Sequence, residues 1–183
     1  MNGANFLPLT GLRILTFENF GAGPFGSMYL ADLGAEVIKI ERPGGGDDAR
    51  AFGPPSLQDP EGKANNNNSF YLCANRNKRS VGLDLSKPAG REVLMRLLEG
   101  ADVLVENFKP GSMEKWGLGY EAVLSKTFPR LIHCRVSGFG GEGPLVRDVL
   151  EHVHHHHALE GRVGPGQASA AYQLHPLAHQ LAD

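Results

Sequence analysis

The chain has 183 residues, of which 41% are hydrophobic and 21% charged, a composition typical of one globular domain with a real core and not of a disordered chain. Its formal net charge is only −2, so no broad field favours nucleic acid or an anionic membrane surface, and any anion site must be local. No apolar run approaches the ~20 residues of a membrane span, and two distant cysteines without a secretory leader predict a reduced, cytoplasmic protein.

The first 40 residues read as strand, glycine turn, helix and strand. Residues 12–17 form a short β-like run, and the turn Gly21-Ala22-Gly23-Pro24 follows it. A helical pattern over 25–33 ends at Gly34, as a C-cap would, and 37–40 is a second buried-strand run. This order predicts a βαβ unit, whose parallel sheet needs helices on both faces.

Residues 43–68 are rich in Gly, Pro, Asp and Asn and have no periodicity. The segment is therefore predicted to be a long surface excursion without regular structure. Four consecutive asparagines, Asn65 to Asn68, are expected to be its most flexible part.

Short apolar runs alternate with helical segments through the next part of the chain. Strands are predicted over 80–85, 101–105 and 131–136, with a helix that Pro88 opens and a brief helix over 121–124. The alternation predicts an α/β fold, an open layered sheet with flanking helices.

The composition changes abruptly near residue 145. From 147 to 183 there is no Lys, Asn, Ile, Phe, Met, Thr, Cys or Trp, and seven of the eight histidines lie there. We interpret 1–145 as the folded region and 146–183 as an irregular, disordered or frameshifted tail. The run His152 to His157 could capture a divalent ion, but it lacks the spacing and supporting shell of a built site, so no metal site is assigned.

Three segments are candidates for binding an anionic ligand. The turn at Gly21 and Ala22 precedes a helix start, which can bind phosphate, although a plain tight turn is the alternative. Arg42 follows a strand and could pair with phosphate or be an ordinary exposed charge. The segment 75–80 holds three cations, which could bind a phosphate or a subunit, or form a solvated turn.

A fourth segment, residues 106–111, joins an asparagine, a phenylalanine and a lysine at another strand end. This mixture suits stacking of a nucleotide base and binding of its polar edge. No Ser-His-Asp or Cys-His arrangement follows from the spacing of residues.

Together these segments resemble the class III CoA-transferase (CaiB/BaiF) family. The matching words are PLTGLRIL, GAGPFGSMYLADLGAEVIKIERPGGGDDAR, NRNKRSVGLDL, ADVLVENFKPGSMEKWGLGYE and SGFGGEGP, in family order over residues 8 to about 144. The resemblance implies a Rossmann-like large domain, incomplete here, and interlocked homodimers among full-length relatives. It implies transfer of CoA from an acyl-CoA to a carboxylic acid, with CoA as substrate and no permanently bound cofactor.

Carried over residue by residue, the resemblance implies CoA contacts at nine positions: Gly21, Ala22, Arg42, Leu83, Asp84, Leu85, Asn107, Phe108 and Lys115, where relatives often have arginine. Leu83 to Leu85 are expected in the strand after the basic turn. Arg76, Lys78 and Arg79 then become structural or interfacial candidates.

The resemblance also implies an aspartate nucleophile downstream of the SGFG segment. Asp148 and Asp183 are the aspartates of the tail, and neither has the matching context, so no catalytic residue is assigned. Three hypotheses remain open: a truncated, inactive CoA-transferase, a CoA-binding or partner-binding fragment without turnover, and a member of the 2-methylacyl-CoA racemase branch.

Overall fold

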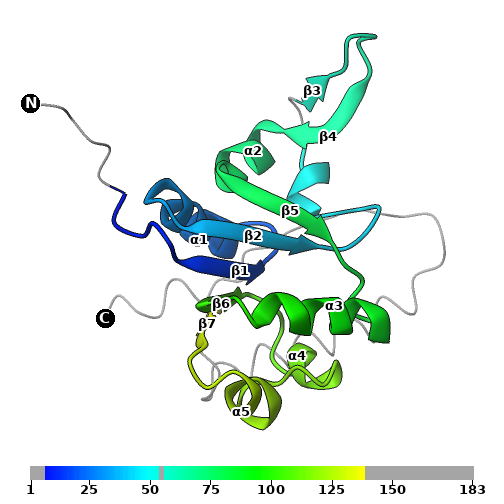
Figure 1. Cartoon of the computed structure of the whole chain (residues 1–183). Coiled ribbons are helices and arrows are strands. Elements are labelled where there is room, and N and C mark those ends of the chain that lie inside the picture. The colour runs from blue at the N-terminus through cyan, green and yellow to red at the C-terminus, as the bar shows by residue number, and fades with distance from the viewer. Residues whose placement is uncertain (1–6, 54–55, 139–183) are drawn as a thin grey trace, which may run out of the picture. The chain divides into compact units, whose positions relative to one another are not determined.

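The computed structural model describes residues 7–53 and 56–138, which form an α/β fold around one parallel sheet (Figure 1). The sheet has five strands in the order β5-β2-β1-β6-β7. Their bounds are β1 Arg13–Phe17, β2 Glu36–Glu41, β5 Lys78–Gly82, β6 Val103–Glu106 and β7 Ile132–Arg135. From β1 the sheet extends to β2 and β5 on one side and then to β6 and β7 on the other, with all strands parallel. This is the Rossmann-like topology, so the expected fold class is confirmed.

Alternating side chains of β1 build two cores, one on each face of the sheet. Leu15 and Phe17 pack with Leu94, Leu98 and Leu104 on one face, whereas Ile14 packs with residues of α1 and β2 on the other. Both faces are covered, as a parallel sheet requires. Strands β1 and β6 therefore carry apolar side chains on both faces, which is why their sequences are nearly continuous hydrophobic runs.

Helices α1, Ala22–Asp32, and α3, Pro88–Leu98, cover the opposite faces. Pro88 occupies the first turn of α3, as predicted. Helix α1 begins three residues earlier than its predicted start at residue 25, because Gly21 is its N-cap and Pro24 fits the first turn. The segment 21–24 is thus mainly the start of a helix.

The segment 43–68 was predicted to lack regular structure, and this prediction is wrong in part. It contains the 3-10 helix η1, Asp48–Ala51, and an antiparallel hairpin of β3, Ser56–Gln58, and β4, Ala64–Asn68. The hairpin stands off from the main sheet in Figure 1. Asn65 to Asn68 form most of β4, because backbone pairing with β3 needs no particular side chain.

Strand β5 begins and ends earlier than predicted, at residues 78 and 82 instead of 80 and 85. Leu83 to Leu85 therefore lie past its carboxyl end, which corrects their expected place inside the strand. The short helix α2, Ser69–Asn75, precedes β5 and was not predicted.

Between β6 and β7 the chain forms three short helical pieces. They are α4, Ser112–Lys115, the π-helical turn η2, Tyr120–Leu124, and α5, Ser125–Thr127. No helix in the described part of the chain is long and apolar enough to span a membrane. The predicted boundary at residue 145 and the tail 146–183 lie outside the described residues and stay a prediction.

Candidate functional site

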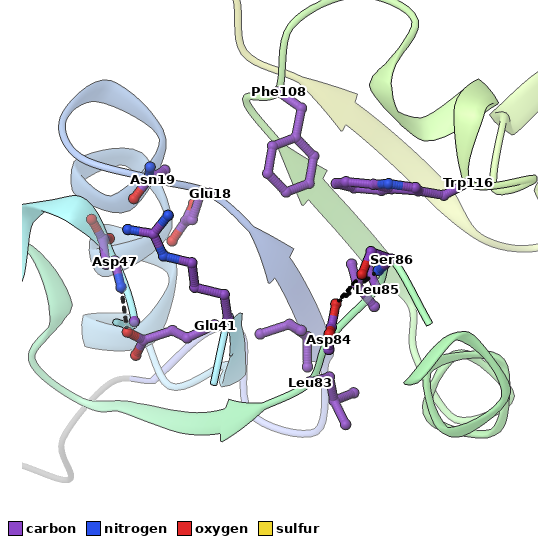
Figure 2. A pocket seen from close by; sticks show the side chains of 13 residues that line it. Glu18, Asn19, Glu41, Asp47, Leu83, Asp84, Leu85, Ser86, Phe108 and Trp116 are labelled. Atoms are coloured by element: carbon purple, nitrogen blue, oxygen red, sulfur yellow. Dashed lines mark hydrogen bonds between the residues drawn. The ribbon is translucent and has the colours of Figure 1, made fainter. Parts of the chain in front are cut away.

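A pocket of about 260 Å³ opens beyond the carboxyl ends of β1, β2, β5 and β6. Parallel α/β sheets usually bind ligands at this edge. Figure 2 shows Phe108 and Trp116 on one side of the pocket and Glu18, Asn19 and Asp47 on the other. The full lining comprises Glu18, Asn19, Ile40, Glu41, Arg42, Gly46, Asp47, Leu83, Asp84, Leu85, Ser86, Phe108 and Trp116.

Two asparagines connect the segments that follow β1 and β6. The side chain of Asn107 accepts a hydrogen bond from the Asn19 amide (2.8 Å) and donates one to the Asn19 carbonyl (2.8 Å). A Cβ on Gly23 would lie only 3.1 Å from Asn107 Cγ and 2.9 Å from Glu18 Cβ. The glycine therefore lets the start of α1 approach both strands closely.

Glu41, at the end of β2, is the centre of a buried polar network. It accepts hydrogen bonds from Arg50 Nε (2.8 Å), Ser80 Oγ (2.6 Å), the Asp47 amide (2.8 Å) and Tyr71 Oη (2.9 Å). Burial by itself raises the pKa of Glu41, but these hydrogen bonds, that of Arg50 first, outweigh it and lower the pKa to about 2. The carboxylate is thus fully engaged.

Two lysines neutralise two further buried carboxylates, those of Asp47 and Glu18. Lys39 Nζ lies 2.6 Å from Asp47 Oδ2, and Lys78 Nζ lies 2.8 Å from Glu18 Oε1. The side chain of Lys78 is only 2% exposed, so its interpretation as part of a solvated basic turn is wrong. Lys78 begins strand β5, and its ammonium group donates to Glu18 Oε1 and to the Pro24 carbonyl of α1.

Arg42 is the one cation among the residues that line this pocket. Its guanidinium lies 2.5 Å from Asp48 Oδ1, and the two side chains are 66% and 52% exposed. Exposed ion pairs contribute only about 0–1 kcal/mol. An incoming phosphate could therefore take Arg42 from Asp48 at little cost.

The turn after β5 is fixed by helix α3. The guanidinium of Arg91 donates to the carbonyls of Leu85 and Ser86 (both 2.9 Å). A Cβ on Gly90 would lie 2.1 Å from the Asp84 carbonyl oxygen, so α3 packs directly on this turn. Asp84 itself accepts from Ser86 Oγ (2.6 Å), and its carboxylate lies 3.4 Å from Lys87.

Phe108 and Trp116 form an aromatic corner on the other side of the pocket. Their ring centroids are 5.3 Å apart at an interplanar angle of 89°, and Phe108 also stacks on Phe17 at 6.3 Å. An edge-to-face pair with one ring anchored in the core is a rigid apolar wall. Such a wall suits a planar ring of a ligand.

Five of the nine predicted contact residues line the pocket: Arg42, Leu83, Asp84, Leu85 and Phe108. The other four do not line it: Gly21 and Ala22 begin α1, Asn107 bridges to Asn19, and Lys115 is exposed at the end of α4. Glu18, Asn19 and Trp116 are among the lining residues that reasoning from the sequence missed. The first two directly follow a predicted strand, a signal that could have identified them.

Comparison with known proteins gives a consistent family. The profile of CoA-transferase family III matches residues 9–149. The chain is 44% identical over 138 residues to the succinyl-CoA:glutarate CoA-transferase of Mus musculus, covering 75% of this chain and 30% of that protein. It is 44% identical over 155 residues to the succinyl-CoA–L-malate CoA-transferase beta subunit of Chloroflexus aurantiacus, covering 85% and 36%.

Solved structures agree with the sequence matches. A CAIB/BAIF family protein from Brucella suis is 42% identical with a TM-score of 0.69, covering 76% of this chain and 35% of that one. A hypothetical protein from Mycobacterium tuberculosis is 40% identical with a TM-score of 0.63, covering 75% and 35%. The chain thus spans about a third of the length of these relatives.

Proposed function

Because the chain belongs to CoA-transferase family III, we propose that it carries the coenzyme A-binding part of an enzyme that moves CoA from an acyl-CoA to a carboxylic acid. The observation that carries the proposal is the pocket at the strand ends, where Arg42, the apolar turn after β5 and the aromatic corner converge. A cation, an apolar stretch and a flat ring surface match the phosphates, the pantetheine arm and the adenine ring of CoA.

Each part of CoA has a place in this proposal. A phosphate pairs with Arg42, whose partner Asp48 is exposed and easily replaced. The adenine ring packs against Phe108 and Trp116, and Leu83 to Leu85 contact the adjoining part of the ligand. A pocket of about 260 Å³ encloses only one portion of CoA, so the remainder lies along the surface beside Gly21, Ala22 and Lys115.

The family chemistry needs a carboxylate that attacks the thioester carbonyl. The resulting mixed anhydride is attacked by the released CoA thiolate, which frees the first acid and leaves an enzyme thioester for the acceptor acid to resolve. Among the described residues the pocket carboxylates all have partners: Glu18 (through Oε1), Glu41 and Asp47 form ion pairs with buried or half-buried cations, and Asp84 accepts from Ser86. We therefore propose that the 183-residue chain by itself binds CoA without turnover.

Transfer is proposed in preference to racemisation because the relatives described above are named as CoA-transferases of glutarate and L-malate. Small dicarboxylic acids are accordingly the first acceptors to test. We also propose that the whole protein forms a homodimer, as the family resemblance implies. Free, exposed thiols at Cys73 and Cys134 fit a reducing compartment such as the cytoplasm.

The proposal is tested by titrating the chain with CoA in a calorimeter. Replacement of Arg42 by alanine should weaken binding by about 1–3 kcal/mol, the scale of a hydrogen bond to a charged group. Asp48→Ala is the matched control, because it removes the exposed partner and leaves the cation, and it should bind CoA at least as tightly. Absence of CoA binding by the unaltered chain would refute the proposed function.

CoA exchange from succinyl-CoA to glutarate or L-malate should be measured on the same sample. We expect no turnover by this chain. Exchange well above the uncatalysed rate would show that a nucleophile is present, and the proposal of binding without turnover would be abandoned.

A further inference from the structure

Three phenylalanines form an exposed aromatic cluster beside the pocket. Phe20 follows β1, Phe52 directly follows η1, and Phe70 lies in the first turn of α2. Their ring centroids are 5.0–5.4 Å apart, yet Phe20 is 42% exposed, Phe52 55% and Phe70 36%. The rings therefore contact one another and still present apolar surface to solvent.

The backbone holds Phe20 in an unfavourable conformation. Its φ is 68°, in the left-handed region that a residue with a large side chain rarely adopts. A hydrogen bond from the Phe20 amide to Asp47 Oδ1 (2.8 Å) and the two bonds between Asn19 and Asn107 support it there. Backbone strain of this kind is typical of functional sites, and here it presents an apolar ring to solvent.

The cluster adjoins the proposed CoA pocket on the side of Asn19 and Asp47. Both of these residues line the pocket; Asn19 precedes Phe20 in the chain, and Asp47 accepts from its amide. Figure 2 shows them across the pocket from the aromatic corner, to which the proposed function assigns adenine. CoA carries its adenine and its thioester at opposite ends. A CoA molecule that extends from the aromatic corner past Arg42 therefore brings its thioester toward the cluster.

We propose that Phe20, Phe52 and Phe70 bind an apolar acyl group of the CoA thioester. The inference rests on the proposed function and extends it to the class of acyl donor, since the family resemblance assigns none of these three residues. Uncharged rings exclude water from a hydrocarbon chain, and they offer a desolvated carboxylate no partner. The preferred donor is therefore an apolar acyl-CoA and not a dicarboxylic one such as succinyl-CoA.

The test is calorimetric titration of the whole chain with butyryl-CoA, succinyl-CoA and CoA itself. The two acyl chains have equal length and differ at their ends, a methyl group against a carboxylate. Butyryl-CoA should bind about tenfold more tightly than succinyl-CoA, the scale of burying a short apolar chain. Phe52→Ala should remove most of this difference and leave the affinity for CoA unchanged. Phe52 is the most exposed ring of the three, so the variant should fold, and Phe70→Ala should act in the same way.

Phe25→Ala is the matched control. Phe25 is 46% exposed and packs edge-to-face on Tyr29 at 5.4 Å, but it lies in α1 and is not part of the cluster. The variant loses a similarly exposed ring, so its preference for butyryl-CoA should persist. Adenosine 3′,5′-bisphosphate, which has no acyl group, should bind the original chain and the Phe52 variant equally.

Several results would overturn the inference while the proposed function stands. Equal binding of butyryl-CoA and succinyl-CoA, or a preference that both Phe52→Ala and Phe70→Ala retain, would show that the rings do not contact the acyl group. Weaker binding of adenosine 3′,5′-bisphosphate by the Phe52 variant would place the adenine ring at the cluster instead. A dimer that Phe52→Ala dissociates in sedimentation, with an unchanged acyl preference, would make the cluster a subunit contact. If the original chain binds neither CoA nor its thioesters, the proposed function and the inference both fail.

Discussion

Glu41 shows how a single buried side chain fixes the geometry of this site. It is 6% exposed, and it receives Arg50, Ser80 and Tyr71 from three different segments. Gly46 closes the loop around it with φ of 68°, and a Cβ there would lie 2.6 Å from Glu41 Oε2. The network fixes the path of the chain from β2 to η1, and with it the position of Arg42.

The low pKa of Glu41 makes folding stability depend on pH. The pKa lies at about 2 in the folded protein against an ordinary value of 4.5, so the stabilisation is complete above about pH 4.5. It is lost as the pH falls toward 2, because the unfolded chain takes up the proton first. Urea unfolding measured from pH 7 to pH 2 should show this decline.

Glu41→Gln should remove part of that pH dependence and lower the free energy of unfolding at pH 7 by about 3–5 kcal/mol, the usual cost of breaking a buried ion pair. Glu36→Gln is the control, since Glu36 pairs with Arg13 at the surface and its loss should matter much less. An unchanged pH profile in the Glu41 variant would contradict the assignment of this carboxylate.

At the scale of elements, the start of α1 is a place where the prediction from the sequence differs from the structure. Gly21 to Pro24 were predicted to be a turn before the helix, whereas they form the N-cap and first turn of a helix packed on two strand ends. The contacts with ligand that the resemblance implies at Gly21 and Ala22 stay a prediction. Gly23 permits this packing, because a helix can approach a strand closely only where it lacks a side chain.

Two glycines of α1 give a matched test of this packing. Gly26 faces open space, so Gly26→Ala should stabilise the protein by about 0.5–1 kcal/mol through helix propensity. Gly23→Ala places a methyl group against Glu18 and Asn107 and should destabilise it by about 1–3 kcal/mol, as overpacking does. Thermal unfolding of both variants measures the difference, and equal effects would refute close packing at Gly23.

At the scale of the whole molecule, the described residues make a sheet with two open edges, β5 and β7. Ile132 on β7 is 62% exposed. Open edges and exposed apolar side chains favour association with another chain, which agrees with the proposed homodimer. The pocket lies at the carboxyl ends of the strands and not along either edge strand.

Ligand binding should be visible in the stability of the entire fold. A ligand that binds only the folded state at 100 times its dissociation constant adds about 2.7 kcal/mol to the free energy of unfolding. Saturating CoA should therefore raise the melting temperature of the chain by several degrees, and removal of CoA by dialysis should reverse the change. An identical melting temperature with and without CoA would argue against a site in the folded protein.

The sequence by itself determined the alternation of the main strands and helices along the chain, the family, and the location of candidate residues at strand ends. Those features depend on local periodicity and on short motifs, which a linear reading detects. It could not show that Leu83 to Leu85 lie beyond β5, because strand ends depend on pairing with a neighbour.

Only the tertiary structure decided which polar groups meet. Lys78 and Glu18 are 60 residues apart in the chain, yet they form a buried ion pair, and Trp116 reaches the pocket from beyond α4. Charges that look solvated in sequence become buried when a partner at long range compensates their desolvation. Such partnerships follow from the pairing of β5 with β2 and from the packing of α1 on the sheet, which no spacing along the chain encodes.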